Sequence, residues 1–204
     1  MLKICEIFED IEGEGKYQGY PTLFIRLAGC NLRCSWCDTK YAYYKGKTMA
    51  LKNLLQRAGK SRYKYVSITG GEPLLCKKET AQLAKAIREK YKKKVTIETN
   101  GSVSIKGIPA DNISMDLKLP SSGESDKMLL SNLEILKPRD QLKLVIGSAK
   151  DMLYAKKILS KHAVKADIIA QPVSGKITLK KIRDFVMKNS LPWKVSCQLH
   201  KIIK

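Results

Sequence analysis

The stretch from Thr22 to Thr39 reads TLFIRLAGCNLRCSWCDT, and it joins an apolar run to a loop that is rich in cysteine. Residues 22–27 are apolar nearly throughout, which is typical of a strand in a parallel sheet that is covered on both faces. Arg26 is the exception in this run. We expect the strand to deliver the cysteine loop from its C-terminal end, so the stretch predicts a sheet-based fold with this loop at one rim.

Cys30, Cys34 and Cys37 follow the spacing C-x3-C-x2-C. Thiolates are soft ligands that select zinc, copper(I) or iron–sulfur clusters. A structural zinc site is normally closed by four ligands, and no second CxxC pair or HxxxH follows here. Three cysteines on a four-iron four-sulfur cluster leave one iron without a protein ligand. We therefore expect a cluster with an open iron that can take a substrate or cofactor.

The cysteines could also serve in a zinc site or in disulfides. Cys76, Cys197 or a histidine from elsewhere in the fold could complete a zinc site. A disulfide framework is not favoured, because the remaining cysteines are scattered and nothing indicates secretion. The zinc site stays the alternative.

Apolar runs alternate with amphipathic patterns along the whole chain, which predicts a parallel sheet with helical crossovers. The expected strands are Leu2–Phe8, Thr22–Leu27, Tyr65–Thr69, Val95–Glu98, Ile113–Leu117, Leu142–Ile146, Asp167–Ala170 and a terminal strand over Trp193–Lys201. The expected helices are Thr48–Ala58, Thr80–Tyr91, Met128–Leu136, Met152–Leu159 and Leu179–Val186. The 204 residues are too few for a complete barrel of about 250 residues. We predict an α/β fold with one domain over residues 1–204, a partial TIM-like barrel of about six parallel strands with outer helices.

The chain is strongly basic, with 39 Lys and Arg against 19 Asp and Glu and a formal net charge of +20. Such a charge indicates attraction to anionic substrates, nucleic acid or an acidic partner. The lysines are spread along the chain, as on a solvated surface, and no nucleic-acid motif is present, so we do not expect nucleic acid binding. Residues 1–10 lack a signal-peptide core and no run approaches about 20 apolar residues. We therefore expect a cytoplasmic protein with no membrane contact.

Polar and glycine-rich segments follow the predicted strands, at the edge where parallel sheets bind ligands. Gly70-Gly71-Glu72-Pro73 is one of them, and a Gly-Gly pair lets a ligand approach the backbone closely. The C-x3-C-x2-C spacing with Trp36 before the last cysteine resembles the radical S-adenosylmethionine superfamily, and so does this GGEP segment. The resemblance implies that the methionyl group of S-adenosylmethionine binds the open iron, so that one electron releases a 5′-deoxyadenosyl radical.

Further motifs resemble the 7-carboxy-7-deazaguanine synthase family from end to end. They are Glu6-Ile7-Phe8, Gly13-Glu14-Gly15, Arg26, Cys37-Asp38-Thr39, Pro120-Ser121-Ser122-Gly123, Gln171-Pro172 and Gln198-Leu199-His200-Lys201. The resemblance implies a carbon–nitrogen lyase that converts 6-carboxy-5,6,7,8-tetrahydropterin to 7-carboxy-7-deazaguanine with loss of ammonia, on the route to queuosine or archaeosine. It also implies one 4Fe-4S cluster, S-adenosylmethionine and Mg²⁺ as cofactors, an electron donor such as flavodoxin or ferredoxin, and a homodimer.

The resemblance assigns roles residue by residue and makes no side chain a catalytic acid or base. The cluster ligands are Cys30, Cys34 and Cys37, and Thr39 is a magnesium ligand. The contacts to S-adenosylmethionine are Trp36, Cys37, Asp38, Gly71, Asp116, Leu117, Lys118, Gln171, Pro172, Val173 and Ser174. The contacts to the pterin are Ile11, Glu12, Gly13, Arg26 and Thr69.

This chain departs from the family at two places. Glu12 stands where the family commonly has glutamine, and Asp116-Leu117-Lys118 stands where it commonly has Ser-Pro-Lys. The second segment is closer to the Asp-x-Lys of glycyl-radical activating enzymes. An activating enzyme with a protein substrate is therefore the alternative function. A third hypothesis, motivated by the charge of +20, is a zinc- or cluster-bearing nucleic-acid binder without catalysis.

Overall fold

The computed structural model describes residues 1–203, and in this part of the chain nine strands form one sheet in the order β3-β1-β2-β4-β5-β6-β7-β8-β9. The strands are β1 (Leu2–Ile11), β2 (Pro21–Leu27), β3 (Lys47–Met49), β4 (Tyr65–Gly70), β5 (Lys94–Thr99), β6 (Asn112–Asp116), β7 (Gln141–Ile146), β8 (Asp167–Pro172) and β9 (Trp193–Val195). From β2 to β9 each neighbouring pair is parallel, while β1 is antiparallel to β2 and β3. The sheet is not closed, because β3 and β9 are its two edges.

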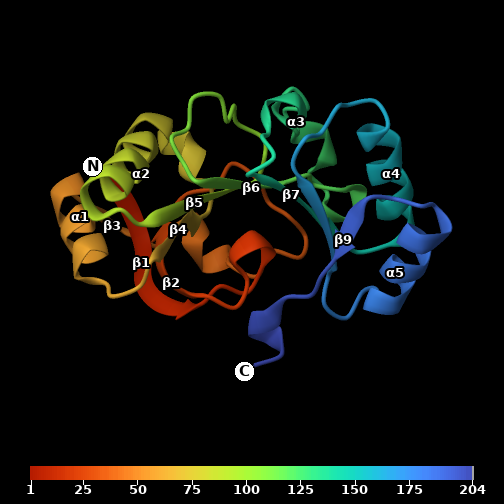
Figure 1. Cartoon of the computed structure of the whole chain (residues 1–204), viewed down its shortest axis with the longest axis horizontal. Coiled ribbons are helices and arrows are strands. Elements are labelled where there is room, and N and C mark those ends of the chain that lie inside the picture. The colour runs from red at the N-terminus through yellow and green to blue at the C-terminus, as the bar shows by residue number, and fades with distance from the viewer. Residues whose placement is uncertain (204) are drawn as a thin grey trace.

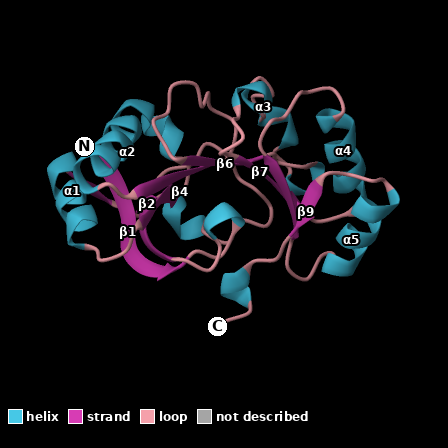
Figure 2. Ribbon diagram, viewed as in Figure 1, coloured by secondary structure: helices cyan, strands magenta, loops and turns pink. Residues whose placement is uncertain are grey.

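Five helices accompany the sheet in the described part of the chain: α1 (Leu51–Lys60), α2 (Lys77–Tyr91), α3 (Asn132–Ile135), α4 (Ala149–Leu159) and α5 (Leu179–Lys188). They lie around the outside of the arc that the strands form, with α1 and α2 near one end and α4 and α5 near the other (Figure 1). The C-terminal segment lies at the open side of this arc, as the ribbon coloured by secondary structure also shows (Figure 2). The predicted partial barrel with outer helices is confirmed.

The strands have one apolar and one polar face. Ile25 is in register with Ile68, and Ile68 with Ile97, and all three side chains are fully buried in the core under the helices. Successive side chains of a strand point to opposite faces. Arg26 and its register partner Thr69 therefore lie on the other face of the sheet, which lines a cavity. This alternation places polar groups on the inner side of the arc.

Four expectations about the elements need correction. The helix expected from Thr48 begins at Leu51, because residues 47–49 pair with β1 instead. The helix expected over Met128–Leu136 is only α3. Residues 128–131 are not helical, and the Leu129 amide donates to the Gly101 carbonyl at 3.1 Å instead.

The terminal strand expected over Trp193–Lys201 ends at Val195. The chain then leaves the sheet, and the Leu199 amide donates to the Gly13 carbonyl at 2.9 Å before a 3-10 turn over Leu199–Lys201. Its first residues nevertheless add a parallel strand, so the parallel part of the sheet has seven strands in the described chain rather than about six.

None of the helices within residues 1–203 combines the length and the apolar composition that a membrane crossing requires.

Candidate active site

The C-terminal ends of the parallel strands surround a cavity of about 470 Å³. Most of the residues predicted for the site line it: Ile11, Glu12, Gly13, Arg26, Cys30, Cys34, Trp36, Cys37, Asp38, Thr39, Thr69, Gly71, Asp116, Lys118, Gln171, Val173 and Ser174. Leu117 and Pro172 do not line it. Leu117 is buried in the hydrophobic core, and Pro172 pairs with Ile146 at the end of β8. The fold brings the other predicted site residues together around one cavity.

The cysteine loop is fixed by hydrogen bonds to the segment after β6. The Ser35 hydroxyl donates to the Ser121 carbonyl at 2.7 Å, and the Arg33 amide donates to Glu124 Oε1 at 2.5 Å. The 121–122 segment is itself held by Asp151, whose carboxylate accepts the Ser121 amide at 2.9 Å. These bonds set the path of the loop through its backbone and leave the thiols free for ligation.

The three thiols of the loop are unpaired and face the same cavity. Burial raises the pKa of both Cys30 and Cys34. Among residues 1–203, no three His, Cys, Asp or Glu side chains are placed so that they could hold a single metal ion, and Cys76 and Cys197 do not line the cavity. The arrangement does not provide the four ligands of a closed zinc site. Three thiols spread around a cavity suit a cluster, in which each cysteine binds a different iron.

Gly70 and Gly71 bring the end of β4 against the start of the cysteine loop. Gly70 has φ of +135°, and a Cβ atom at Gly71 would collide with the Gly29 carbonyl. The close approach lets the Gly71 amide donate to the Leu27 carbonyl at 3.0 Å and the Glu72 amide to Gly29 at 2.8 Å. Glycine is required here because no side chain fits between the two backbones. The Gly70-Gly71 segment, which is predicted to meet the cofactor, is thus packed directly on the cysteine loop.

Glu72, which follows the two glycines, is buried and holds the turn after β5. Its carboxylate accepts hydrogen bonds from the Leu74 amide at 2.8 Å, the Thr99 hydroxyl at 2.8 Å and the Asn100 amide at 2.6 Å. Burial raises the pKa of Glu72 to about 6. Asn100 in turn directs its side-chain amide at Cys30 Sγ, 3.7 Å away. The sequence placed both residues in segments that follow strand ends but assigned no role to either side chain.

The Asp116–Lys118 segment lies beside the aromatic residue of the cysteine loop. Lys118 Nζ is 2.5 Å from Asp116 Oδ2 and 5.2 Å from the centre of the Trp36 ring. Two buried polar atoms of the wall, Trp36 Nε1 and Gln171 Oε1, have no hydrogen-bond partner within residues 1–203. Buried polar groups are nearly always hydrogen-bonded, so a donor and an acceptor without partners indicate a ligand with both functions. S-adenosylmethionine has such groups, and these residues fit it.

Glu12 and Glu98 form an acidic part of the cavity wall. Glu12 is only 7% exposed, and its carboxyl accepts one long hydrogen bond, from the Glu14 amide at 3.4 Å. Burial, followed by the nearby charge of Glu98, raises the pKa of Glu12 to about 8. Glu98 accepts hydrogen bonds from the hydroxyls of Ser67 at 2.9 Å and Thr69 at 3.0 Å. At neutral pH Glu12 is therefore mostly protonated and can donate a hydrogen bond, as a glutamine amide would.

Arg26 and Thr39 line the cavity together with the cysteine loop. Arg26 Nε donates to Glu6 Oε1 at 2.7 Å, and the guanidinium lies 5.4 Å from the centre of the Phe8 ring. The Nη groups of Arg26 have no hydrogen-bond partner in the described part of the chain. The Thr39 hydroxyl donates to Asp38 Oδ1 at 2.8 Å. Both side chains line the cavity and present polar atoms to it.

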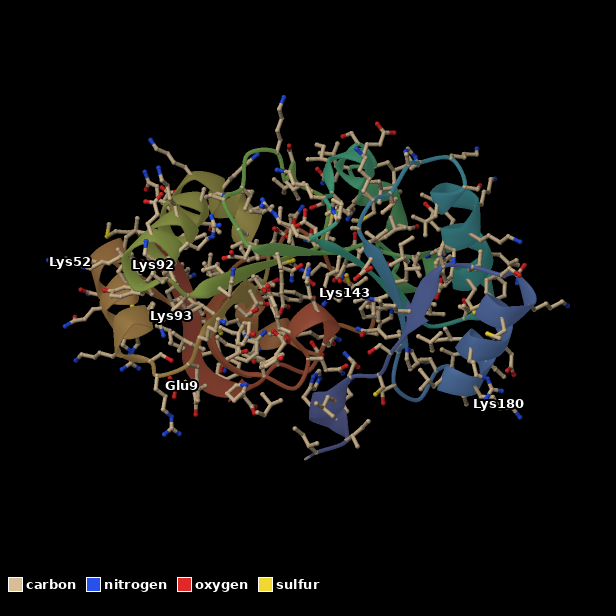
Figure 3. The ribbon with its side chains drawn as sticks, in the orientation of Figure 1. Glu9, Lys52, Lys92, Lys93, Lys143 and Lys180 are labelled. Carbon is tan, nitrogen blue, oxygen red and sulfur yellow. The ribbon has the colours of Figure 1, made fainter. Side chains whose placement is uncertain are left out.

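An ion pair between Glu14 and Lys143 connects the walls of the cavity, and Lys143 was not predicted from the sequence. Lys143 Nζ on β7 lies 2.9 Å from Glu14 Oε2 and 3.5 Å from Asp116 Oδ1. Burial alone would raise the pKa of Glu14, but the Lys143 charge and hydrogen bonds lower it to about 2. Lys143 lies near the middle of the molecule, whereas Lys52, Lys92 and Lys180 lie on its periphery (Figure 3). The signal in the sequence is a lysine within an otherwise apolar run, Leu-Lys-Leu-Val-Ile.

Comparison with known proteins agrees with this geometry. The radical SAM superfamily model matches residues 24–141. The 7-carboxy-7-deazaguanine synthase of Methanospirillum hungatei is 44% identical over 203 residues, which cover 99% of this chain and 85% of that protein. The one of Thermoplasma acidophilum is 37% identical over 99% of this chain and 97% of its own length. The chain belongs to the 7-carboxy-7-deazaguanine synthase family. The crystal structure of QueE from Escherichia coli superposes on this family member with a TM-score of 0.81, at 26% identity over 98% of this chain and 94% of that one.

Family membership confirms several expectations from the sequence. The chain is a radical S-adenosylmethionine enzyme of the lyase class, and its superfamily uses a 4Fe-4S cluster with S-adenosylmethionine. The individual residue assignments, the magnesium ion, the electron donor and the dimer remain predictions.

Proposed function

We propose that this chain converts 6-carboxy-5,6,7,8-tetrahydropterin to 7-carboxy-7-deazaguanine with loss of ammonia, in the biosynthesis of queuosine or archaeosine. The observation that carries the proposal is the composition of one cavity. Its wall contains the three unpaired thiols, the polar groups of Trp36, Asp116, Lys118 and Gln171, and the segment 11–14 with Arg26. The near full-length similarity to synthases of this name supports the same reaction.

The cofactor side of the cavity is assigned to the cysteine loop and three rim segments. When bound, the cluster and S-adenosylmethionine supply the radical that removes hydrogen from the substrate carbon bearing the carboxylate. Trp36 Nε1 and Gln171 Oε1 are the buried donor and acceptor without a partner in the described chain, and Gly71 lines the cavity where it packs on the cysteine loop. The role of this chain is to orient the reacting groups and to exclude water around them.

The substrate side of the cavity has groups for both ends of a carboxylated pterin. The Nη groups of Arg26 can bind the carboxylate in a fork that Lys would not offer. The guanidine-like edge of a pterin carries N–H groups, and the Glu98 carboxylate can accept hydrogen bonds from them. Glu12, whose pKa is raised to about 8, avoids a second negative charge beside the anionic substrate at neutral pH.

A magnesium ion at Thr39 is part of the proposal. Magnesium is a hard cation that prefers oxygen ligands and keeps several waters. The Thr39 hydroxyl lines the cavity beside the Asp38 carboxylate, so both oxygen atoms are within reach of one small site. The carboxylate of the substrate would complete the set of oxygen ligands.

The remaining partners are inferred from family resemblance. We propose a flavodoxin or a ferredoxin as the electron donor, and a homodimer as the assembled form. The basic character of the chain, with a net charge of +20, would favour an acidic donor protein.

The reaction is tested with anaerobically reconstituted protein. S-adenosylmethionine, a reductant, magnesium and the carboxylated tetrahydropterin are supplied, and 5′-deoxyadenosine and 7-carboxy-7-deazaguanine are quantified. Formation of both compounds is expected. Deoxyadenosine without the deazaguanine would favour the activating-enzyme alternative, which the Asp116-Leu117-Lys118 segment motivates. Zinc in place of a cluster, with neither product, would favour the non-catalytic binder.

The magnesium assignment has its own test. Thr39→Ala should lose stimulation by magnesium while it retains its cluster. Thr48→Ala, at an exposed threonine on β3, is the matched control and should respond like the wild type. An equal magnesium response in the Thr39 variant would remove this residue from the metal site.

A further inference from the structure

We propose that Lys143 is a positioning residue that couples substrate binding to cofactor binding. Its ammonium contacts Glu14, which directly follows residues 11–13 assigned to the pterin, and Asp116 in the segment 116–118 assigned to S-adenosylmethionine. The inference rests on the proposed function for the assignment of these two segments.

The turn side of this connection is built around Glu14. Its carboxylate lies 2.9 Å from Lys143 Nζ and accepts hydrogen bonds from Gln171 Nε2 at 2.8 Å and Gln198 Nε2 at 2.5 Å. Gln171 belongs to the second segment assigned to the cofactor. Glu14 directly follows Gly13, so a change in its position moves the backbone of the segment assigned to the pterin. One carboxylate therefore links the substrate turn to three other parts of the chain.

The cofactor side of the connection continues to the cysteine loop. Lys143 Nζ lies 3.5 Å from Asp116 Oδ1, while Asp116 Oδ2 lies 2.5 Å from Lys118 Nζ. The Lys118 ammonium is in turn 5.2 Å from the centre of the Trp36 ring, next to Cys37. Alternating charges thus run from the substrate turn to the loop that holds the cluster ligands. Asp116 stands where the family commonly has serine, and its carboxylate is the negative charge between Lys143 and Lys118.

The members of this connection are largely shielded from solvent, since the side chains of Glu14 and Asp116 are only 16% and 18% exposed. Lys143 is only 7% exposed. Burial alone would lower the pKa of Lys143, but the charges of Asp116, Glu14 and Glu98 hold it well above its ordinary value. Removing one member of a buried ion pair leaves the other charge without compensation in a medium of low dielectric constant. A ligand that fixes Asp116–Lys118 therefore also fixes Glu14, and the reverse holds by thermodynamic linkage.

A purely structural role for Lys143 makes a different prediction from coupling. If Lys143 only stabilised the fold, its loss would lower the unfolding temperature and leave the coupling between the two ligands as it is in the wild type. The decisive quantity is the ratio of the S-adenosylmethionine dissociation constants measured without and with saturating carboxylated tetrahydropterin. This ratio does not depend on turnover and can be measured by calorimetry on the anaerobic, cluster-loaded protein without reductant.

In the wild type we expect the pterin to tighten S-adenosylmethionine binding by about fivefold or more, the usual lower range of coupling between sites. Lys143→Met and Asp116→Ser should each lower this ratio to below about twofold. Lys143→Arg keeps the charge and should retain most of the coupling. Asp116→Ser serves as the second variant if Lys143→Met does not fold, because it removes the same connection from the other end.

Arg88→Met is the matched control. Arg88 Nε on α2 pairs with Asp111 Oδ2 at 2.8 Å, and neither residue lines the cavity. This variant loses a partly buried ion pair, so it should be less stable and keep the wild-type ratio.

The outcomes separate the inference from the proposed function. Wild-type protein that binds both ligands without mutual tightening would overturn the inference alone, as would unchanged coupling in Asp116→Ser. A control variant that loses coupling as fully as Lys143→Met would also overturn it, because general destabilisation would then explain the effect. Wild-type protein that binds S-adenosylmethionine but not the pterin would overturn the proposed function together with the inference.

Discussion

The inner and outer lysines of this chain occupy opposite environments. Lys118 and Lys143 are buried on the inner side of the sheet, and each lies within ion-pair distance of a carboxylate. Lys52, Lys92 and Lys180 are exposed at the periphery of the molecule (Figure 3). Exposed charges are well solvated and contribute little to stability individually, whereas a buried charge must be compensated. The excess of basic residues is thus mainly a property of the outer surface, and the balanced inner charges bear on function.

Substitutions of cysteine should give the largest difference in effect between the cavity side and the outer surface of the molecule. Cys30→Ala removes a thiol that faces the cavity, and we expect loss of the intact cluster and of S-adenosylmethionine cleavage. Cys76→Ala removes an exposed thiol away from the cavity and should change neither. Iron and sulfide content with visible absorption after anaerobic reconstitution measures the effect. A full cluster in Cys30→Ala would show that this cysteine is not a ligand.

Replacing inner and outer lysines should give a smaller but clear contrast in stability. Lys143→Met leaves Glu14 and Asp116 without their shared cation and should lower the free energy of unfolding by about 3–5 kcal/mol. Lys180→Met should change it by no more than about 0.5 kcal/mol. Urea unfolding at pH 7 of the cluster-free proteins measures both. Equal stabilities of the two variants would contradict the distinction between inner and outer charge.

Glu12→Gln sharpens the comparison through pH. The pKa of Glu12 is raised from 4.5 to about 8 in the folded chain, so its contribution to stability is present below pH 4.5 and is lost as the pH rises toward 8. Over this range the wild type should lose up to about 1.4 kcal/mol per pH unit relative to the variant. Glutamine keeps the hydrogen-bonding shape without a charge. Parallel stability curves for the two proteins would show that Glu12 is ionised in the folded state.

The smallest effect is expected for an ion pair on the outer surface. Lys85 Nζ on α2 lies 3.9 Å from Glu89 Oε1, and both side chains are largely exposed. Lys85→Met should lower the free energy of unfolding by less than about 0.5 kcal/mol, and salt should reduce the difference further. A loss as large as that of Lys143→Met would contradict the comparison.

The sequence predicted the cavity wall well where a residue type directly follows a strand. The cysteine loop after Leu27 and Gly70-Gly71 after Thr69 lie where the rule for parallel sheets places them. The predicted elements failed at segments whose partners are far apart in sequence. Residues 47–49 form a strand only because β1 offers an edge, and the chain after Val195 leaves the sheet because Gly13 accepts a hydrogen bond from Leu199.

The charged pair of Glu14 and Lys143 shows why part of the site escaped prediction. Glu14 belongs to the Gly13-Glu14-Gly15 motif and Lys143 stands in an apolar run, but neither local pattern names the other residue. Only the fold shows that the two meet across 129 positions. Leu117 shows that side-chain burial also depends on the tertiary structure. It lies inside a polar segment predicted to bind the cofactor, but its side chain fills the core instead. Periodicity predicts burial along one element, whereas pairing between elements requires the tertiary structure.

The partners of Glu14 lie 129, 157 and 184 positions away along the chain. Bringing such distant residues together carries an entropic cost that local contacts do not, and chains rich in long-range contacts fold slowly. The turn that follows β1 therefore gains its contacts with Lys143, Gln171 and Gln198 only when β7, β8 and the C-terminal segment are in place. Local opening at β8 and β9 would release that turn as well, so the two ends of the molecule should lose their amide-exchange protection together.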